Sequence, residues 1–137
     1  MRKALIGTVA SALVLTMPVA AYAQTSVSCM YMLMRAYHAE LDACHAPLNA
    51  PREARYQRMK AGLEKFIRAN AKNDPEKILS NVDDNVKRAV ALLKSCNSDD
   101  FKAAQAALDN ITTEDHEKLI QGTLSVARDP RVGDCSS

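Results

Sequence analysis

Four cysteines constrain the fold of this chain more than any other feature of its sequence. They stand at positions 29, 44, 96 and 135 of 137 residues. An even number of cysteines in a short exported chain is typical of a disulfide framework, and four cysteines allow three pairings. The sequence therefore predicts two disulfides, provided that the chain leaves the cytoplasm.

The first residues predict that export. A basic start at residues 1–3 precedes an apolar stretch from Ala4 to Val19, and Ala-Tyr-Ala at 21–23 supplies a small-x-small cleavage pattern. We expect residues 1–23 to be removed as a signal peptide and residues 24–137 to form a single domain. The apolar stretch is shorter than the roughly 20 residues of a membrane-spanning helix. We therefore expect a periplasmic or secreted protein without a membrane anchor.

Removal of the signal peptide changes the charge balance. Without Arg2 and Lys3, sixteen of the eighteen basic residues remain, against sixteen acidic residues. The balance is uneven along the chain, with a net charge of +4 over residues 24–72 and −4 over residues 73–137. Antiparallel helices of opposite charge would account for this gradient. Because the mature chain has no net positive charge, we expect no binding of nucleic acid.

Apolar residues recur at steps of three and four, which predicts helices. We expect helices over residues 27–46, 52–71 and 75–96, a helix from Ser98 to about Asn110, and one from Thr112 or Thr113 to just before Pro130. Residues 81–85 are poor in helix-forming residues, so we expect a break in the third helix there. No segment alternates convincingly as a strand. The predicted fold class is all-α, a small antiparallel bundle of four to five helices stapled by two disulfides.

Helix geometry narrows the disulfide pairing. Cys29 and Cys44 stand fifteen residues apart on one predicted helix, which separates them by roughly 22 Å, whereas a disulfide needs Cα atoms within about 7 Å. In an up-down-up arrangement the first and third helices run parallel, which places Cys44 and Cys96 at the same end. We therefore predict Cys44 with Cys96 and Cys29 with Cys135. The swapped pairing, Cys29 with Cys96 and Cys44 with Cys135, stays open at this point.

The first predicted helix also carries residues that suit a transition metal. His38, Asp42 and His45 follow each other at steps of four and three and share a face, and imidazole ligands suit copper or zinc. A helical wheel places this face largely away from the core. The simpler interpretation is that His38 and Asp42 form an exposed pair of small energetic weight.

Most catalytic motifs are missing from the sequence. It contains no C-x-x-C-H, no H-E-x-x-H and no glycine-rich phosphate loop. We expect His116, which stands among acidic residues at a helix start, to be exposed rather than to act as a general base. The sequence thus predicts a protein that is not an enzyme and that has no cofactor.

Basic residues concentrate in the second predicted helix, where Arg52, Arg55 and Arg58 begin the series. Arginine makes bidentate contacts with carboxylates, so these three residues are the candidate contacts to an acidic cleft of another exported protein. A solvated face is the alternative explanation.

Taken together, these features predict a periplasmic helical protein that acts by binding another macromolecule, as an inhibitor, immunity or accessory protein. A small copper- or zinc-binding protein and an acid-stress chaperone are the alternatives. The architecture is similar to that of immunity proteins that neutralise secreted cell-wall amidases and to that of acid-stress chaperones, but no residue motif is shared, and architecture alone does not assign a function.

Overall fold

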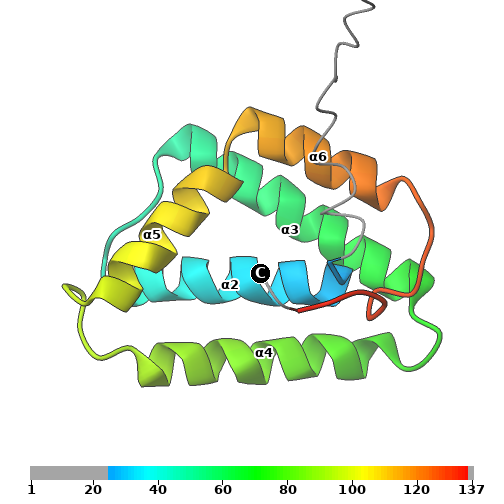
Figure 1. Cartoon of the computed structure of the whole chain (residues 1–137), viewed down its shortest axis with the longest axis horizontal. Helices are drawn as coiled ribbons and strands as arrows, with labels where there is room; N and C mark the ends of the chain where they lie inside the picture. The colour runs from blue at the N-terminus through cyan, green and yellow to red at the C-terminus, as the bar shows by residue number, and fades with distance from the viewer. Residues whose placement is uncertain (1–24, 136–137) are drawn as a thin grey trace, which may run out of the picture.

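The computed structural model describes residues 25–135, and the predicted signal peptide lies outside them. The described chain folds into five helices, which confirms the predicted fold class (Figure 1). The helices are α2 (Val27–Ala43), α3 (Ala50–Asn70), α4 (Pro75–Leu92), α5 (Asp99–Ile111) and α6 (Glu114–Leu124).

Side-chain caps fix where the helices begin. Each helix follows a Ser, Asn, Asp or Thr whose side chain accepts a hydrogen bond from the backbone N–H three residues later, and these caps are Ser26, Asn49, Asp74, Ser98 and Thr113. Such a bond satisfies one of the backbone donors that a helix start leaves unpaired. Because Asn49 is the cap of α3, this helix begins two residues before the predicted Arg52.

The predicted break at residues 81–85 was wrong, because α4 continues through them. Val82 and Val86 are buried on one side of α4, and the side chain of Asn85 donates to the carbonyl oxygen of Asn81 at 2.9 Å. Burial of the apolar side therefore outweighs the low helix propensity of the segment. Helices α2, α4 and α6 end earlier than predicted, at Ala43, Leu92 and Leu124.

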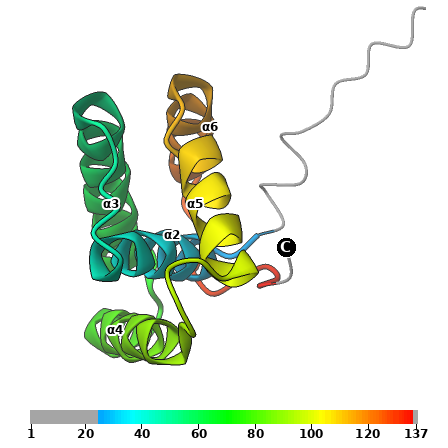
Figure 2. The ribbon, with the colours of Figure 1, turned by 90° about the vertical axis from the view of Figure 1, so that its left-hand side faces the viewer.

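Helix α2 lies at the centre of the fold. It packs against α3, α4 and α5, while α3 also contacts α6. Figure 2 shows α4 on one side of α2, with α3 and the α5–α6 pair rising on the other. Tyr31, Met34 and Leu41 of α2 are almost completely buried and belong to one core with residues of the other helices.

Both disulfides have the predicted pairing, Cys44 with Cys96 and Cys29 with Cys135. Helices α2 and α4 run in the same direction (Figure 1), so the C-terminal ends of both lie together. The Cα atoms of Cys44 and Cys96 are 5.5 Å apart, and those of Cys29 and Cys135 are 5.4 Å apart. One disulfide therefore fixes each end of α2.

The segment after α6 returns to the start of α2, as the second disulfide requires. Pro130 is buried, and its carbonyl oxygen accepts from the backbone N–H of Ser28 at 2.9 Å. The N–H of Ser26 likewise donates to the carbonyl oxygen of Asp134 at 3.2 Å. Within residues 25–135, no helix is long and apolar enough to cross a membrane.

Replacing Cys44 and Cys96 together by Ala should lower the free energy of unfolding by about 4 kcal/mol, as loop entropy gives for a closed loop of this length. The disulfide joins residues 52 positions apart, so its loss frees much of the unfolded chain. Urea unfolding of the disulfide-bonded natural protein and of the double variant, followed by circular dichroism, measures the difference. Equal free energies of unfolding would contradict this role for the disulfide.

Candidate functional site

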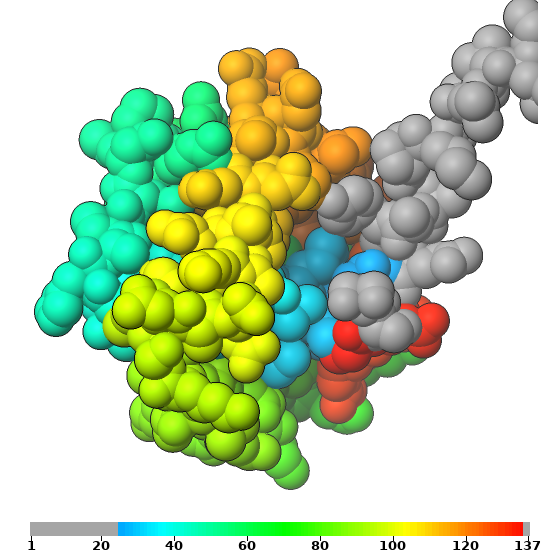
Figure 3. All heavy atoms as spheres, turned by 60° about the vertical axis from the view of Figure 1, so that its left-hand side comes forward, coloured from blue at the N-terminus to red at the C-terminus, as the bar shows by residue number. Residues whose placement is uncertain are grey.

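An apolar groove lies between α2, α5 and α6. Its volume is about 280 Å³. On α2 it is lined by residues at helical spacing, namely Met30, Leu33, Met34 and Tyr37. Figure 3 shows part of the surface of α2, in blue, between α5, in yellow, and the red C-terminal segment.

The groove has a buried floor and partly exposed walls. Met34, Leu63 and Ile120 are almost completely buried and form the floor. The side chains of Met30 and Leu33 are only half-buried. When a partner covers half-buried apolar side chains in a concave surface, the free energy falls by roughly 25 cal/mol per Å² of apolar surface removed from water. This arrangement suits the binding of another apolar group.

A few polar groups border the apolar surface, among them His116 and Asn110. The expectation that His116 is exposed was wrong, because its side chain is half-buried beside the groove. Burial lowers the pKa of the imidazole, since the charged form loses solvation. At neutral pH this histidine therefore presents a neutral polar group at the edge of the groove.

His38 lies elsewhere, on the side of α2 that faces α3, and its predicted exposure was also wrong. Its side chain is 15% exposed and stacks on the ring of Tyr56, with 3.8 Å between the ring centroids. Nδ1 lies 3.2 Å from a carboxylate oxygen of Asp42, and Nε2 lies 2.9 Å from a carboxylate oxygen of Glu53. The imidazole thus joins α2 to α3.

This placement gives no support to the predicted metal site. Both ring nitrogens of His38 face carboxylates, while His45 is exposed beyond the end of α2. Among residues 25–135, no group of three or more His, Cys, Asp or Glu side chains is arranged to hold a metal ion. A metal site at His38, Asp42 and His45 stays a prediction without a supporting contact.

A second polar network also joins α2 to its neighbours. The hydroxyl of Tyr31 donates to Glu64 of α3 and accepts from Nη1 of Arg35 at 2.8 Å. Nη2 of Arg35 pairs with Asp83 of α4 at 2.9 Å. Burial and the hydrogen bond to Glu64 raise the pKa of Tyr31 to about 12. The charged side chains of this network therefore interact with one another and join α2 to α3 and α4.

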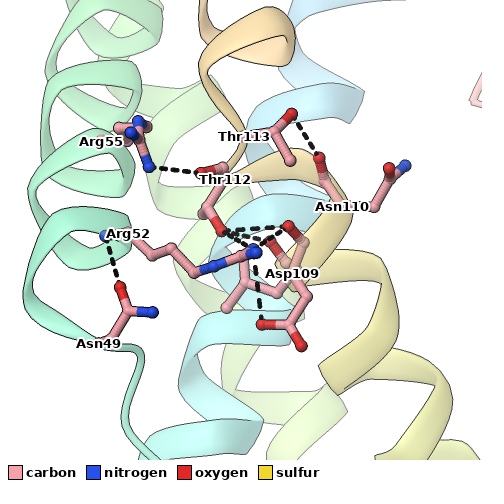
Figure 4. A network of polar contacts seen from close by, with 8 residues as sticks. Asn49, Arg52, Arg55, Asp109, Asn110, Thr112 and Thr113 are labelled. Carbon is pink, nitrogen blue, oxygen red and sulfur yellow. Dashed lines mark hydrogen bonds and ion pairs between the residues drawn. The ribbon is translucent and has the colours of Figure 1, made fainter.

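The predicted partner-binding arginines contact other parts of the same chain. Figure 4 shows Arg52 and Arg55 reaching from α3 to the connection between α5 and α6. Arg52 donates to the carbonyl oxygen of Asp109 and to the hydroxyl of Thr112, the latter at 3.3 Å. Nη1 of Arg55 lies 3.5 Å from the carbonyl oxygen of Thr112. Both arginines therefore satisfy acceptors at the C-terminal end of α5.

Arg58 makes the strongest contact of the three. Its Nε and Nη2 donate to the two carboxylate oxygens of Glu117 on α6, at 2.6 and 2.9 Å. The side chain of Glu117 is only 10% exposed. This bidentate pair lowers the pKa of Glu117 and holds α6 against α3. An acidic partner is not needed to explain the three arginines.

The groove itself was not predicted from the sequence. Met30, Leu33 and Tyr37 follow each other at steps of three and four, a spacing that is typical of the core side of a helix. The structure leaves them half-buried, since α5 and α6 cover that side incompletely. The methionines in this helix were the available signal, because flexible thioether side chains are common at adaptable binding surfaces.

Replacing Glu117 by Gln should lower the urea midpoint at pH 7, because the bidentate pair loses its negative partner. The pKa of Glu117 is lowered in the folded protein, so its contribution to stability is complete above the unfolded pKa of about 4.3. That contribution is lost as the pH falls through the lower folded pKa. Urea unfolding at pH 7 and at acidic pH measures this difference. Glu114→Gln, at an exposed pair in the same helix, is the control, and an equal loss at every pH would contradict the explanation.

No protein-family model, curated protein or solved structure matches this chain.

Proposed function

We propose that this protein is exported and acts by binding another exported protein, as an inhibitor, immunity or accessory protein, and that the groove between α2, α5 and α6 accepts apolar side chains of that partner. The groove is the observation that carries this proposal. It combines a buried apolar floor with the half-buried side chains of Met30, Leu33 and Tyr37.

The size and openness of the groove favour a protein segment over a small ligand. Its volume of about 280 Å³ is at the lower end of the roughly 300–1,000 Å³ of typical small-molecule sites, which enclose most of their ligand. A shallow apolar surface between helices instead suits the helix-in-groove mode of recognition. Met30 and Met34 add adaptability, because unbranched thioethers adjust to different shapes.

The two disulfides are compatible with a protein outside the cytoplasm, where they persist. The predicted signal peptide supports a periplasmic or secreted location. A partner that binds this protein in the periplasm or outside the cell must itself be exported. The search for the partner can therefore be restricted to exported proteins.

A photo-crosslinking amino acid at position 33 tests this proposal in the cell. The full precursor with this replacement is produced in its native host and irradiated, and the adducts are separated under denaturing conditions. We expect a discrete adduct with one other exported protein, because position 33 lies in the wall of the groove. A matched variant carries the same amino acid at the exposed position 65 of α3.

The adduct should be absent from the variant at position 65, and it should be lost when Met30→Asp is combined with the crosslinker at position 33. Met30 is half-buried, so the change alters the groove more than the core, and circular dichroism checks the fold. Identical adducts from positions 33 and 65, or none from position 33, would contradict binding through the groove.

A further inference from the structure

The two disulfides differ in how far they are buried. Cys29, in the first turn of α2, is only 2% exposed, although its partner Cys135 is exposed. Cys44 directly follows α2 and is half-buried, and Cys96 is exposed in the connection between α4 and α5. The Cys44–Cys96 disulfide therefore lies at the surface, whereas one half of the Cys29–Cys135 disulfide lies inside the protein.

The turn that carries Cys96 is held by hydrogen bonds within itself. The backbone N–H of Asn97 donates to the hydroxyl of Ser95, and the backbone N–H of Ser98 donates to the carbonyl oxygen of Ser95, both at 3.3 Å. In Figure 1 this connection between α4 and α5 lies at one end of the molecule, beside the end of α2. Because Ser95, Cys96 and Asn97 are all exposed, a dissolved thiol can reach Sγ of Cys96.

Thiol–disulfide exchange needs access to one sulfur atom and a place where the other can leave as a thiolate. If Cys96 is attacked, Cys44 leaves at a position that water reaches. If Cys135 is attacked, Cys29 must leave as a buried and unpaired negative charge. The first turn of α2 favours a negative charge, but the loss of solvation of a buried, unpaired ion is the larger effect.

We infer that Cys44–Cys96 is a site of thiol–disulfide exchange in the folded protein, that its reaction partner is a dithiol, and that Cys29–Cys135 exchanges only when the protein opens. One thiolate of the dithiol attacks Sγ of Cys96, the bond to Cys44 breaks, and Cys44 leaves as a thiolate that takes a proton from water. The other thiolate of the dithiol attacks the mixed disulfide, so Cys96 leaves as a thiolate and is protonated in turn. The dithiol becomes a disulfide, and the protein gains two thiols. This inference goes beyond the proposed function and does not depend on the groove.

Helix α5 is held in place by contacts other than this disulfide. Phe101 and Leu108 are buried in the core, and Arg52 of α3 donates to the carbonyl oxygen of Asp109 and to the hydroxyl of Thr112. Reduction of Cys44–Cys96 should therefore free the connection between α4 and α5 more than the helices that it joins.

Reduction of the disulfide-bonded natural protein by dithiothreitol tests this inference. Samples are quenched by alkylation at successive times, and mass spectrometry of the digested protein locates the modified cysteines, while circular dichroism follows the helices. We expect Cys44 and Cys96 to be modified at least about tenfold faster than Cys29 and Cys135, because the second pair waits for an opening of the structure. Urea below the unfolding transition should accelerate only the reduction of Cys29–Cys135, since urea lowers the free energy of that opening.

Two matched variants test which sulfur atom is attacked. Cys44→Ser leaves the thiol of Cys96, and Cys96→Ser leaves the thiol of Cys44, so both lack the same disulfide. After circular dichroism has established that both are folded, we expect Cys96 to react faster with the disulfide reagent dithionitrobenzoate, because it is the more exposed residue.

Three results would overturn the inference. Equal rates for the two disulfides, or earlier reduction of Cys29–Cys135, would show that burial of Cys29 does not protect its disulfide. Equal acceleration of both reductions by urea would show that Cys44–Cys96 also needs an opening of the structure. A faster reaction of Cys44 than of Cys96 would refute attack on Cys96.

Discussion

The packing of α2 against three other helices is the interaction on which the rest of this structure depends. Tyr31, Met34 and Leu41 are buried along this helix, and a disulfide fixes each of its ends. A chain of this size has a small core, so cross-links that restrict the unfolded state add stability that apolar burial alone does not supply. Because α3, α4 and α5 leave one strip of α2 incompletely covered, the same packing produces the groove.

Several ion pairs join the helices to one another. His38 links α2 to α3 through Glu53, Arg35 links α2 to α4 through Asp83, and Arg58 links α3 to α6 through Glu117. The pairs Arg35–Asp83 and Arg58–Glu117 join the net positive residues 24–72 to the net negative residues 73–137.

The sequence was sufficient for features that depend on local periodicity and simple geometry. Helical spacing predicted the five helices, and the length of α2 together with the parallel course of α4 predicted Cys44 with Cys96. Local sequence patterns did not predict side-chain contacts with segments that lie far away in the sequence. The partners of Arg52 and Arg58 lie about sixty residues further along the chain, and a helical wheel drawn for one core direction could not place His38, since α2 is covered on several sides.

Hydrogen exchange of the disulfide-bonded protein, resolved by residue, tests most directly the claim that α2 organises the fold. Amides from Tyr31 to Leu41 should exchange only through global unfolding, with the free energy that urea unfolding gives. Amides of α6, whose main helix contacts within residues 25–135 are with α3 and α5, should exchange through smaller openings. If α2 exchanged with a lower free energy of opening than α6, the central role of α2 would be contradicted.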